Sequence, residues 1–144
     1  MSNWKYKDSY DFEIPQKSIA FIYLITNMDS GRLYVGRKML TSTRKKVLTA
    51  KEKLLPENSR KKFKTDVKDT KWRDYWGTSE ELTKDIKLIG KEKFKREILL
   101  FCDTKTNTSF YETYFQIKYR VLFVDSYNKH IANTKFFKGR VQEL

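Results

Sequence analysis

An apolar stretch at residues 19–26 is the strongest structural signal in the chain. Its sequence, Ile-Ala-Phe-Ile-Tyr-Leu-Ile-Thr, is rich in β-branched and aromatic residues and therefore predicts a buried strand. Residues 27–31 are typical turn formers, and Gly31 can take the positive φ that such a turn requires. Residues 32–36 then predict a return strand, so we expect a hairpin.

A second group of elements is expected after residue 77. The segment Thr78-Ser-Glu-Glu81 has the spacing of a capping box with Thr78 as N-cap, and apolar residues at helical spacing follow over 82–89. Residues 94–101 predict a third strand, and residues 109–121 predict a second helix. This order predicts the α+β class, with a small three-stranded antiparallel or mixed sheet flanked by helices.

Positive charge is concentrated between the second strand and the first helix. The 144 residues include 31 Lys and Arg against 18 Asp and Glu, which gives a net charge of +13. Between Arg37 and Arg73 stand 14 Lys and Arg against four acidic residues, so +10 of the net charge lies there. We expect one domain over residues 1–144, with a core at about 19–133 and a long basic insertion at about 37–73. Charge of this sign favours a polyanion, most often nucleic acid.

Several classes of protein are excluded by composition. The single Cys102 rules out an internal disulfide framework, and the single His130 rules out a two-histidine zinc site. An aromatic content of 15% argues against wholesale disorder. No apolar run approaches the ~18 residues of a membrane span, and the N-terminal segment lacks the apolar core of a signal peptide. We therefore expect no membrane partner and a cytoplasmic location.

Four residues have the chemistry that phosphodiester hydrolysis requires. Tyr23 and Tyr34 fall on adjacent strands of the predicted hairpin, where they can converge on one face. A phenol can accept a proton from water if a nearby cation lowers its pKa, and Arg44 can stabilise a pentacovalent phosphate. Glu112 can hold a divalent cation against the same phosphate.

In their order and spacing these residues resemble the GIY-YIG nuclease family, in particular its small phage-encoded and homing-type members. Phe-Ile-Tyr at 21–23 stands where the family has GIY, and Tyr-Val-Gly at 34–36 stands where it has YIG. Arg44 lies where family members have their catalytic arginine, and Glu112 opens a late helix as the metal-binding glutamate does. The segment 72–79 also resembles phage-type members.

The resemblance implies a DNA endonuclease that uses Mg²⁺ (or Mn²⁺). It implies four catalytic residues, with Glu112 as the metal ligand: Tyr23, Tyr34, Arg44 and Glu112. Which tyrosine acts as the base stays open, and Arg37 and Arg60 are alternatives to Arg44. Further residues are expected to line the site: Gly36, Asn128, His130 and Asn133.

The basic insertion is expected to bind double-stranded DNA through its phosphates, which gives affinity with little sequence information. The cations assigned to this contact are Arg37, Lys38, Lys45, Lys46, Arg60, Lys61 and Lys62. We expect no separate DNA-binding module after the last helix, so sequence choice would come from the insertion, from a homodimer or higher oligomer, or from a partner. A phage-encoded enzyme would act in the host-cell cytoplasm.

The alternative is a noncatalytic nucleic-acid-binding protein that keeps the fold. Tyr23 and Tyr34 would then be half-buried strand aromatics, the commoner fate of tyrosine in such runs, and Arg44 one more cation of the basic insertion. Glu112 argues against this alternative, because a carboxylate beside a phosphate repels it unless a metal intervenes.

Overall fold

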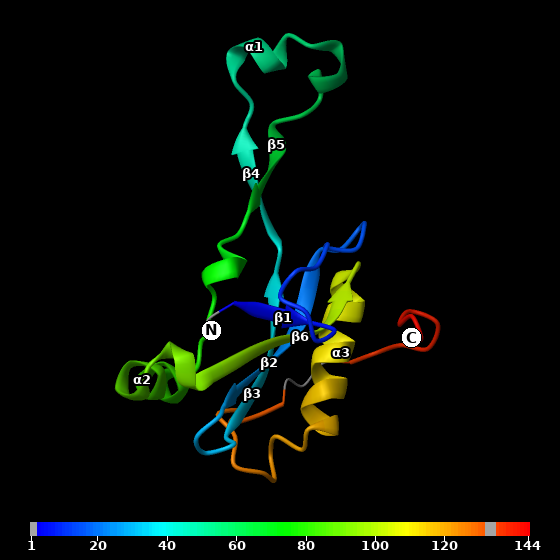
Figure 1. Cartoon of the computed structure of the whole chain (residues 1–144). Helices are drawn as coiled ribbons and strands as arrows, with labels where there is room; N and C mark the ends of the chain where they lie inside the picture. Colours follow the sequence, from blue (N-terminus) through cyan, green and yellow to red (C-terminus); the bar gives the residue numbers. More distant parts are fainter. Residues whose placement is uncertain (1–2, 132–134) are drawn as a thin grey trace. The chain divides into compact units, whose positions relative to one another are not determined.

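The computed structural model describes residues 3–131 and 135–144 of the chain (Figure 1). These residues divide into two compact units, which are described separately. One contains the chain up to Leu40 together with Lys71–Leu144, and the other is Thr41–Thr70. The second unit falls inside the range expected for the basic insertion, whereas Arg37 to Met39 belong to a strand of the first unit.

The first unit is built on a four-stranded mixed sheet with the order β1-β6-β2-β3. Its strands are β1 (Trp4–Tyr6), β2 (Ala20–Asn27), β3 (Leu33–Met39) and β6 (Phe94–Cys102). β2 is antiparallel to both of its neighbours, and β1 is parallel to β6. The predicted α+β class, the hairpin and the third strand are confirmed, and β1 adds a fourth strand to the three expected.

Tertiary contacts rather than sequence pattern explain why β1 forms a strand. It has only three residues, which is too few to show an alternating pattern. The Trp4 side chain is 4% exposed, and its indole Nε1 donates a hydrogen bond to the carbonyl of Trp72 (2.9 Å). The guanidinium of Arg96 lies 4.5 Å from the Trp4 ring centroid. The strand is therefore anchored by one buried side chain.

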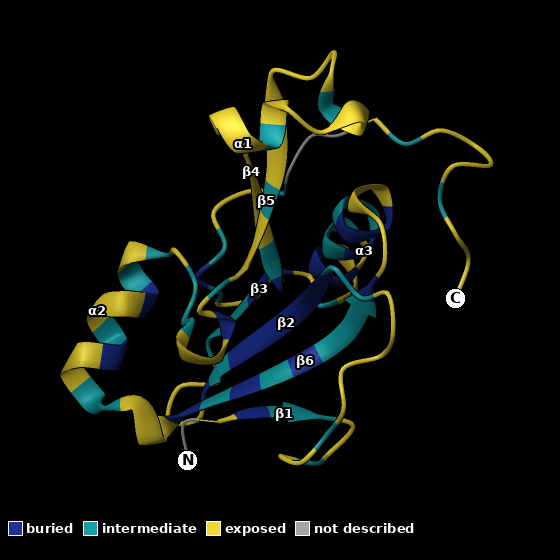
Figure 2. Ribbon diagram, turned by 90° about the horizontal axis from the view of Figure 1, so that it is seen from above, coloured by how far each residue is buried: buried dark blue, intermediate teal, exposed yellow. Residues whose placement is uncertain are grey.

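β2 is buried on both faces because a helix-bearing layer packs on each side of the sheet (Figure 2). Alternate residues of a strand point to opposite faces. Phe21, Tyr23 and Ile25 belong to the core that includes Leu82 and Ile86 of α2 (Glu80–Ile89). The intervening residues of β2 belong to a second core with α3 (Lys105–Lys118), made by Ile22, Leu24, Tyr111 and Phe115.

Both long helices begin at a different residue from the predicted one, because a different side chain caps the N-terminus. Ser79, not Thr78, is the N-cap of α2, since its hydroxyl accepts the backbone N–H of Leu82 (3.3 Å). α3 begins at Lys105, four residues earlier than expected, because the Thr104 hydroxyl caps it through the N–H of Asn107 (3.0 Å). Short 3₁₀ turns occur at Pro56–Asn58, Trp72–Asp74 and Lys91–Lys93. Among the described helices, none combines the length and the apolar character of a membrane span.

The second unit is a two-stranded antiparallel ribbon. β4 (Thr41–Val47) pairs with β5 (Phe63–Asp69), and the short helix α1 (Ala50–Lys53) lies between them in sequence. Most side chains of both strands are exposed. A ribbon held mainly by backbone pairing presents both of its faces to solvent or to a partner.

Candidate active site

The outer edge of β3 is covered by a segment that follows α3. The backbone N–H of Tyr127 donates to the carbonyl of Leu33 (2.7 Å). Asn128 then binds both polar backbone atoms of Val35: its Oδ1 accepts from the N–H (2.9 Å) and its Nδ2 donates to the carbonyl (2.8 Å). One amide side chain thus takes the place of a neighbouring strand at this edge.

A cleft of about 340 Å³ lies beside this edge. Its walls come from β3, the start of α2, α3 and the segment 127–130. The polar and aromatic side chains that line it include Tyr34, Thr78, Glu112, Gln116, Asn128 and His130. Residues from distant parts of the sequence therefore meet in one place, and four of the predicted site residues are among them: Tyr34, Glu112, Asn128 and His130.

Three tyrosines pack together next to the cleft. The ring centroid of Tyr23 lies 6.0 Å from that of Tyr34 and 5.8 Å from that of Tyr75. Tyr23 is 1% exposed, and its hydroxyl lies over Gly36, its partner on β3. A Cβ atom at Gly36 would stand 2.5 Å from the Tyr23 hydroxyl oxygen, so only glycine leaves room for this phenol.

The two predicted catalytic tyrosines have different surroundings. Burial raises the pKa of Tyr23 well above 10.0, and the neighbouring phenols of Tyr34 and Tyr75 raise it further. Tyr23 therefore keeps its proton at neutral pH. Tyr34 lines the cleft, and its hydroxyl lies 3.5 Å from that of Thr78. Of the two, Tyr34 is the phenol that a molecule in the cleft meets.

Glu112 is a mostly buried carboxylate in the same cleft. Its side chain is 15% exposed, and its Oε1 lies 3.8 Å from Nε of Arg37. Burial raises the pKa of Glu112 above 4.5, while Arg37 and His130 oppose this rise. Nη1 of Arg37 also donates to the hydroxyl of Ser109 on α3 (2.7 Å). An arginine, a carboxylate and a phenol are thus grouped at one strand edge.

The other two predicted arginines belong to the ribbon unit. Arg44 lies on β4 opposite Asp66, and Arg60 is an exposed residue of the same ribbon unit. Lys38 lies in the first unit, with Nζ 4.4 Å from the ring centroid of Tyr75. The remaining cations assigned to DNA lie in the ribbon unit: Lys45, Lys46, Lys61 and Lys62. Asn133 lies outside the described residues.

Sequence reasoning missed two residues of this region. Gln116 lies one helical turn after Glu112, and this i, i+4 spacing could have placed it on the same face. Tyr75 has no comparable signal, because it meets Tyr23 only through the path of the chain before α2. Burial raises the pKa of Tyr75 above 10.0 as well.

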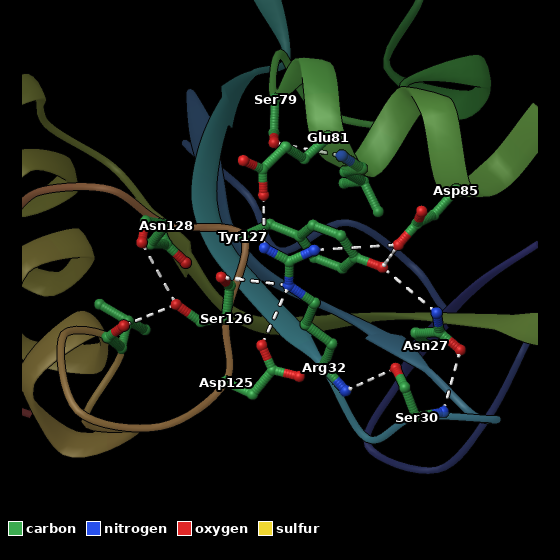
Figure 3. Close-up of polar contacts among 12 residues, drawn as sticks. Asn27, Ser30, Arg32, Ser79, Glu81, Asp85, Asp125, Ser126, Tyr127 and Asn128 are labelled. Atoms are coloured by element: carbon green, nitrogen blue, oxygen red, sulfur yellow. Dashed lines mark hydrogen bonds and ion pairs between the residues drawn. The ribbon is translucent and has the colours of Figure 1, made fainter.

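A polar network fixes the walls of the cleft (Figure 3). Tyr127 donates a hydrogen bond to Oδ2 of Asp85 on α2 (2.6 Å) and accepts one from Nδ2 of Asn27 on β2 (3.2 Å). Arg32 stacks on the Tyr127 ring at 4.1 Å and pairs with Glu81 of α2. The network joins α2, the hairpin and the segment that carries Asn128. These three elements are therefore held in fixed positions relative to one another.

The donor set suits a hydrated divalent cation rather than a protein-enclosed metal. Within the described ranges, no group of three or more His, Cys, Asp and Glu side chains could hold a metal ion. Mg²⁺ usually keeps several waters and takes one or two carboxylates together with substrate phosphate oxygens. Glu112 in an open cleft, which Gln116 and Asn128 also line, fits this mode of binding.

A mixed sheet with paired tyrosines on a central hairpin, and a glutamate brought to the hairpin edge by a late helix, is the arrangement of a GIY-YIG nuclease domain. The family model described as "Putative endonuclease segE, GIY-YIG domain" matches residues 4–137, and the chain belongs to this family of GIY-YIG nucleases. The curated proteins and the solved structures contain no match to the chain. Membership indicates a nuclease of the endonuclease type, and such a domain implies DNA as the substrate and a divalent metal as the usual cofactor.

Proposed function

We propose that this chain is a metal-dependent endonuclease that hydrolyses double-stranded DNA in the cleft at the edge of β3. The observation that carries the proposal is Glu112, a carboxylate 15% exposed that lines the cleft with Tyr34 and lies 3.8 Å from Arg37. In a protein of net charge +13, a buried carboxylate next to a phosphate is favourable only when a cation separates the two.

Glu112 would hold the cation through its carboxylate. When bound, Mg²⁺ or Mn²⁺ would neutralise charge on the scissile phosphate and ease departure of the leaving oxygen. The remaining ligands would be waters and phosphate oxygens, as is usual for Mg²⁺. Gly36 contributes by leaving room for Tyr23, which packs against the ring of Tyr34.

We assign the water-contacting role to Tyr34 and a packing role to Tyr23. Tyr34 lines the cleft, whereas Tyr23 is 1% exposed and has a pKa raised well above 10.0 by burial. A group of such high pKa is a poor general base at neutral pH. Tyr34 would orient the attacking water, and Tyr23 would fix the position of the Tyr34 ring.

Arg37 is our candidate for the arginine that stabilises the phosphorane. Its side chain is 46% exposed and its ion pair with Glu112 is long, at 3.8 Å, so the guanidinium can turn to a phosphate by giving up this pair and its hydrogen bond to Ser109 (2.7 Å). Arg44 remains the alternative that the family spacing favours. Removing a group that stabilises developing charge typically lowers the rate about 10²- to 10³-fold.

The ribbon unit would supply sequence-independent affinity for duplex DNA. Because cross-strand partners share a face, one face carries four cations around Asp66: Arg44, Lys46, Lys64 and Lys68. Lys45 points to the other face with Thr43, Val47 and Val67. B-DNA's major groove, about 12 Å wide, admits a two-stranded ribbon. We therefore propose that the charged face meets the DNA.

Conversion of supercoiled plasmid to nicked or linear DNA tests the proposal. Wild-type protein should cleave in Mg²⁺ and not in EDTA, and Arg37→Gln should slow cleavage far more than Arg44→Gln while both bind DNA. The opposite ranking would return the catalytic role to Arg44. Tight, salt-sensitive binding without cleavage of plasmid or of genomic DNA would favour the noncatalytic alternative.

A further inference from the structure

The side chain of Gln116 is a buried polar group in the cleft with unused hydrogen-bonding capacity. It projects from α3 one turn after Glu112, is 6% exposed and lines the same cleft as Tyr34 and His130. Within the described part of the chain, its Oε1 has no hydrogen-bond partner. Buried side-chain oxygens are nearly always paired with protein, water or an ion, so this one calls for an explanation.

The orientation of the Gln116 amide is fixed by its neighbour. Nε2 of Gln116 donates to the carbonyl of Val35 (3.3 Å), which also accepts from Nδ2 of Asn128 (2.8 Å). A carbonyl oxygen only accepts, so the amide cannot be turned around without setting two acceptors against each other. The carbonyl end of Gln116 therefore points away from Val35.

The missing partner of this oxygen must be a donor. The phosphate and sugar oxygens of a DNA backbone accept hydrogen bonds but offer no donor, and the Glu112 carboxylate is also an acceptor. Asn128 uses both ends of its amide on Val35: Nδ2 donates to the carbonyl (2.8 Å) and Oδ1 accepts the N–H (2.9 Å). A hydrated divalent cation suits both side chains at once, since its waters are strong donors and the cation itself attracts the carboxylate.

We propose that Glu112 and Gln116 together form the cation site, with Glu112 as the ligand and Gln116 accepting a hydrogen bond from a water of the cation's shell. The inference rests on the proposed function, because it concerns the same cation. Side chains four residues apart on a helix are neighbours, with Cβ atoms about 5–6 Å apart, a spacing that one coordinated water can bridge. Such a contact fixes the direction in which that water faces the substrate.

Binding of Mn²⁺ to the full chain without DNA, followed by the electron paramagnetic resonance signal of free Mn²⁺, tests the inference. Gln116→Met removes the acceptor and keeps the volume, and we expect it to weaken Mn²⁺ binding about three- to tenfold. Gln116→Glu also loses the donor to Val35 but keeps an acceptor, so it should bind Mn²⁺ at least as tightly as wild type. Gln16→Met, at an exposed position, is the matched control.

The outcomes separate the two proposals. Unchanged binding in Gln116→Met, or equal weakening in Gln116→Met and Gln116→Glu, would overturn the inference, the second result because the bond to Val35 would then be what matters. Unchanged binding in Glu112→Gln would instead overturn the role of Glu112 in the proposed function. If Gln116→Met does not fold, tighter binding by Gln116→Glu supports the inference and weaker binding by that variant contradicts it.

Discussion

Replacing Gly36 by alanine should force the buried tyrosine of the hairpin out of position. A Cβ atom there would lie 2.5 Å from the hydroxyl oxygen and 2.7 Å from Cζ of Tyr23, closer than real Cβ contacts. The ring cannot swing to solvent, because it is 1% exposed and packs against the rings of Trp4, Tyr34 and Tyr75. The strain must therefore be taken up by the tyrosine cluster or by the backbone of β3.

The expected cost follows from two opposing terms. Overfilling a packed core typically costs about 1–3 kcal/mol. Alanine in a strand is about 0.5–1 kcal/mol better than glycine, because glycine loses more backbone entropy on folding. Gly36→Ala should therefore lower the free energy of unfolding by roughly 0–2.5 kcal/mol, with a mid-range value of about 1 kcal/mol.

Urea unfolding in two backgrounds measures this cost. In a Tyr23→Phe background the nearest clashing atom, the hydroxyl oxygen, is absent, so Gly36→Ala should cost less than it does in the wild type. A stabilising effect in the wild type, or the same effect in both backgrounds, would contradict the expectation that Gly36 is needed to leave room for this phenol.

Three further perturbations test the β3 edge, the buried Tyr127 and the charged face of the ribbon. Asn128→Asp removes the donor to the Val35 carbonyl and should lower the free energy of unfolding by about 1–3 kcal/mol, seen by denaturant titration; no change would mean that the β3 edge does not need this bond. Burial and the hydrogen bond to Asp85 raise the pKa of Tyr127 to about 12, so the native state holds this proton more tightly than the unfolded state. Stability should therefore fall as the pH rises from about 10 toward 12, and Tyr127→Phe should lose this part of the slope; an identical slope in both proteins would contradict it. Replacing three lysines of the ribbon by Gln should make the slope of log K for DNA binding against log salt shallower, by up to about 0.9 per lysine. The same replacement of three exposed lysines in and just after α2 should change this slope less. The ribbon variant replaces Lys46, Lys64 and Lys68, and the control variant replaces Lys84, Lys87 and Lys91.

The elements with strong local patterns could be predicted from sequence. The apolar run of β2 and the turn with Gly31, whose φ is +77°, are set by residues close together in the chain. β1 could not be predicted, because its three residues are held by the contact of Trp4 with a carbonyl 68 positions away. α3 starts four residues before the predicted helix, because the Thr104 cap stabilises a first turn whose polar composition gives no helical pattern.

The same distinction holds in the cleft. Tyr34 and Glu112 could be named from the resemblance to the family motif, and both line the cleft. The different environments of the two tyrosines depend on burial, which spacing does not reveal. The partners of Gln116 and Asn128 depend on a shared contact with the backbone of Val35, more than 80 positions away along the chain.

In the proposed function, Glu112 in the cleft at the edge of β3 supports metal-dependent cleavage of DNA. Single-turnover cleavage of plasmid in Mg²⁺ by wild type, Glu112→Gln and the exposed-surface control Glu13→Gln tests this role. We expect rapid cleavage by wild type and by the control, and at least about a 10²-fold loss in Glu112→Gln with its fold intact. Cleavage by Glu112→Gln at the wild-type rate would show that Glu112 does not have this role.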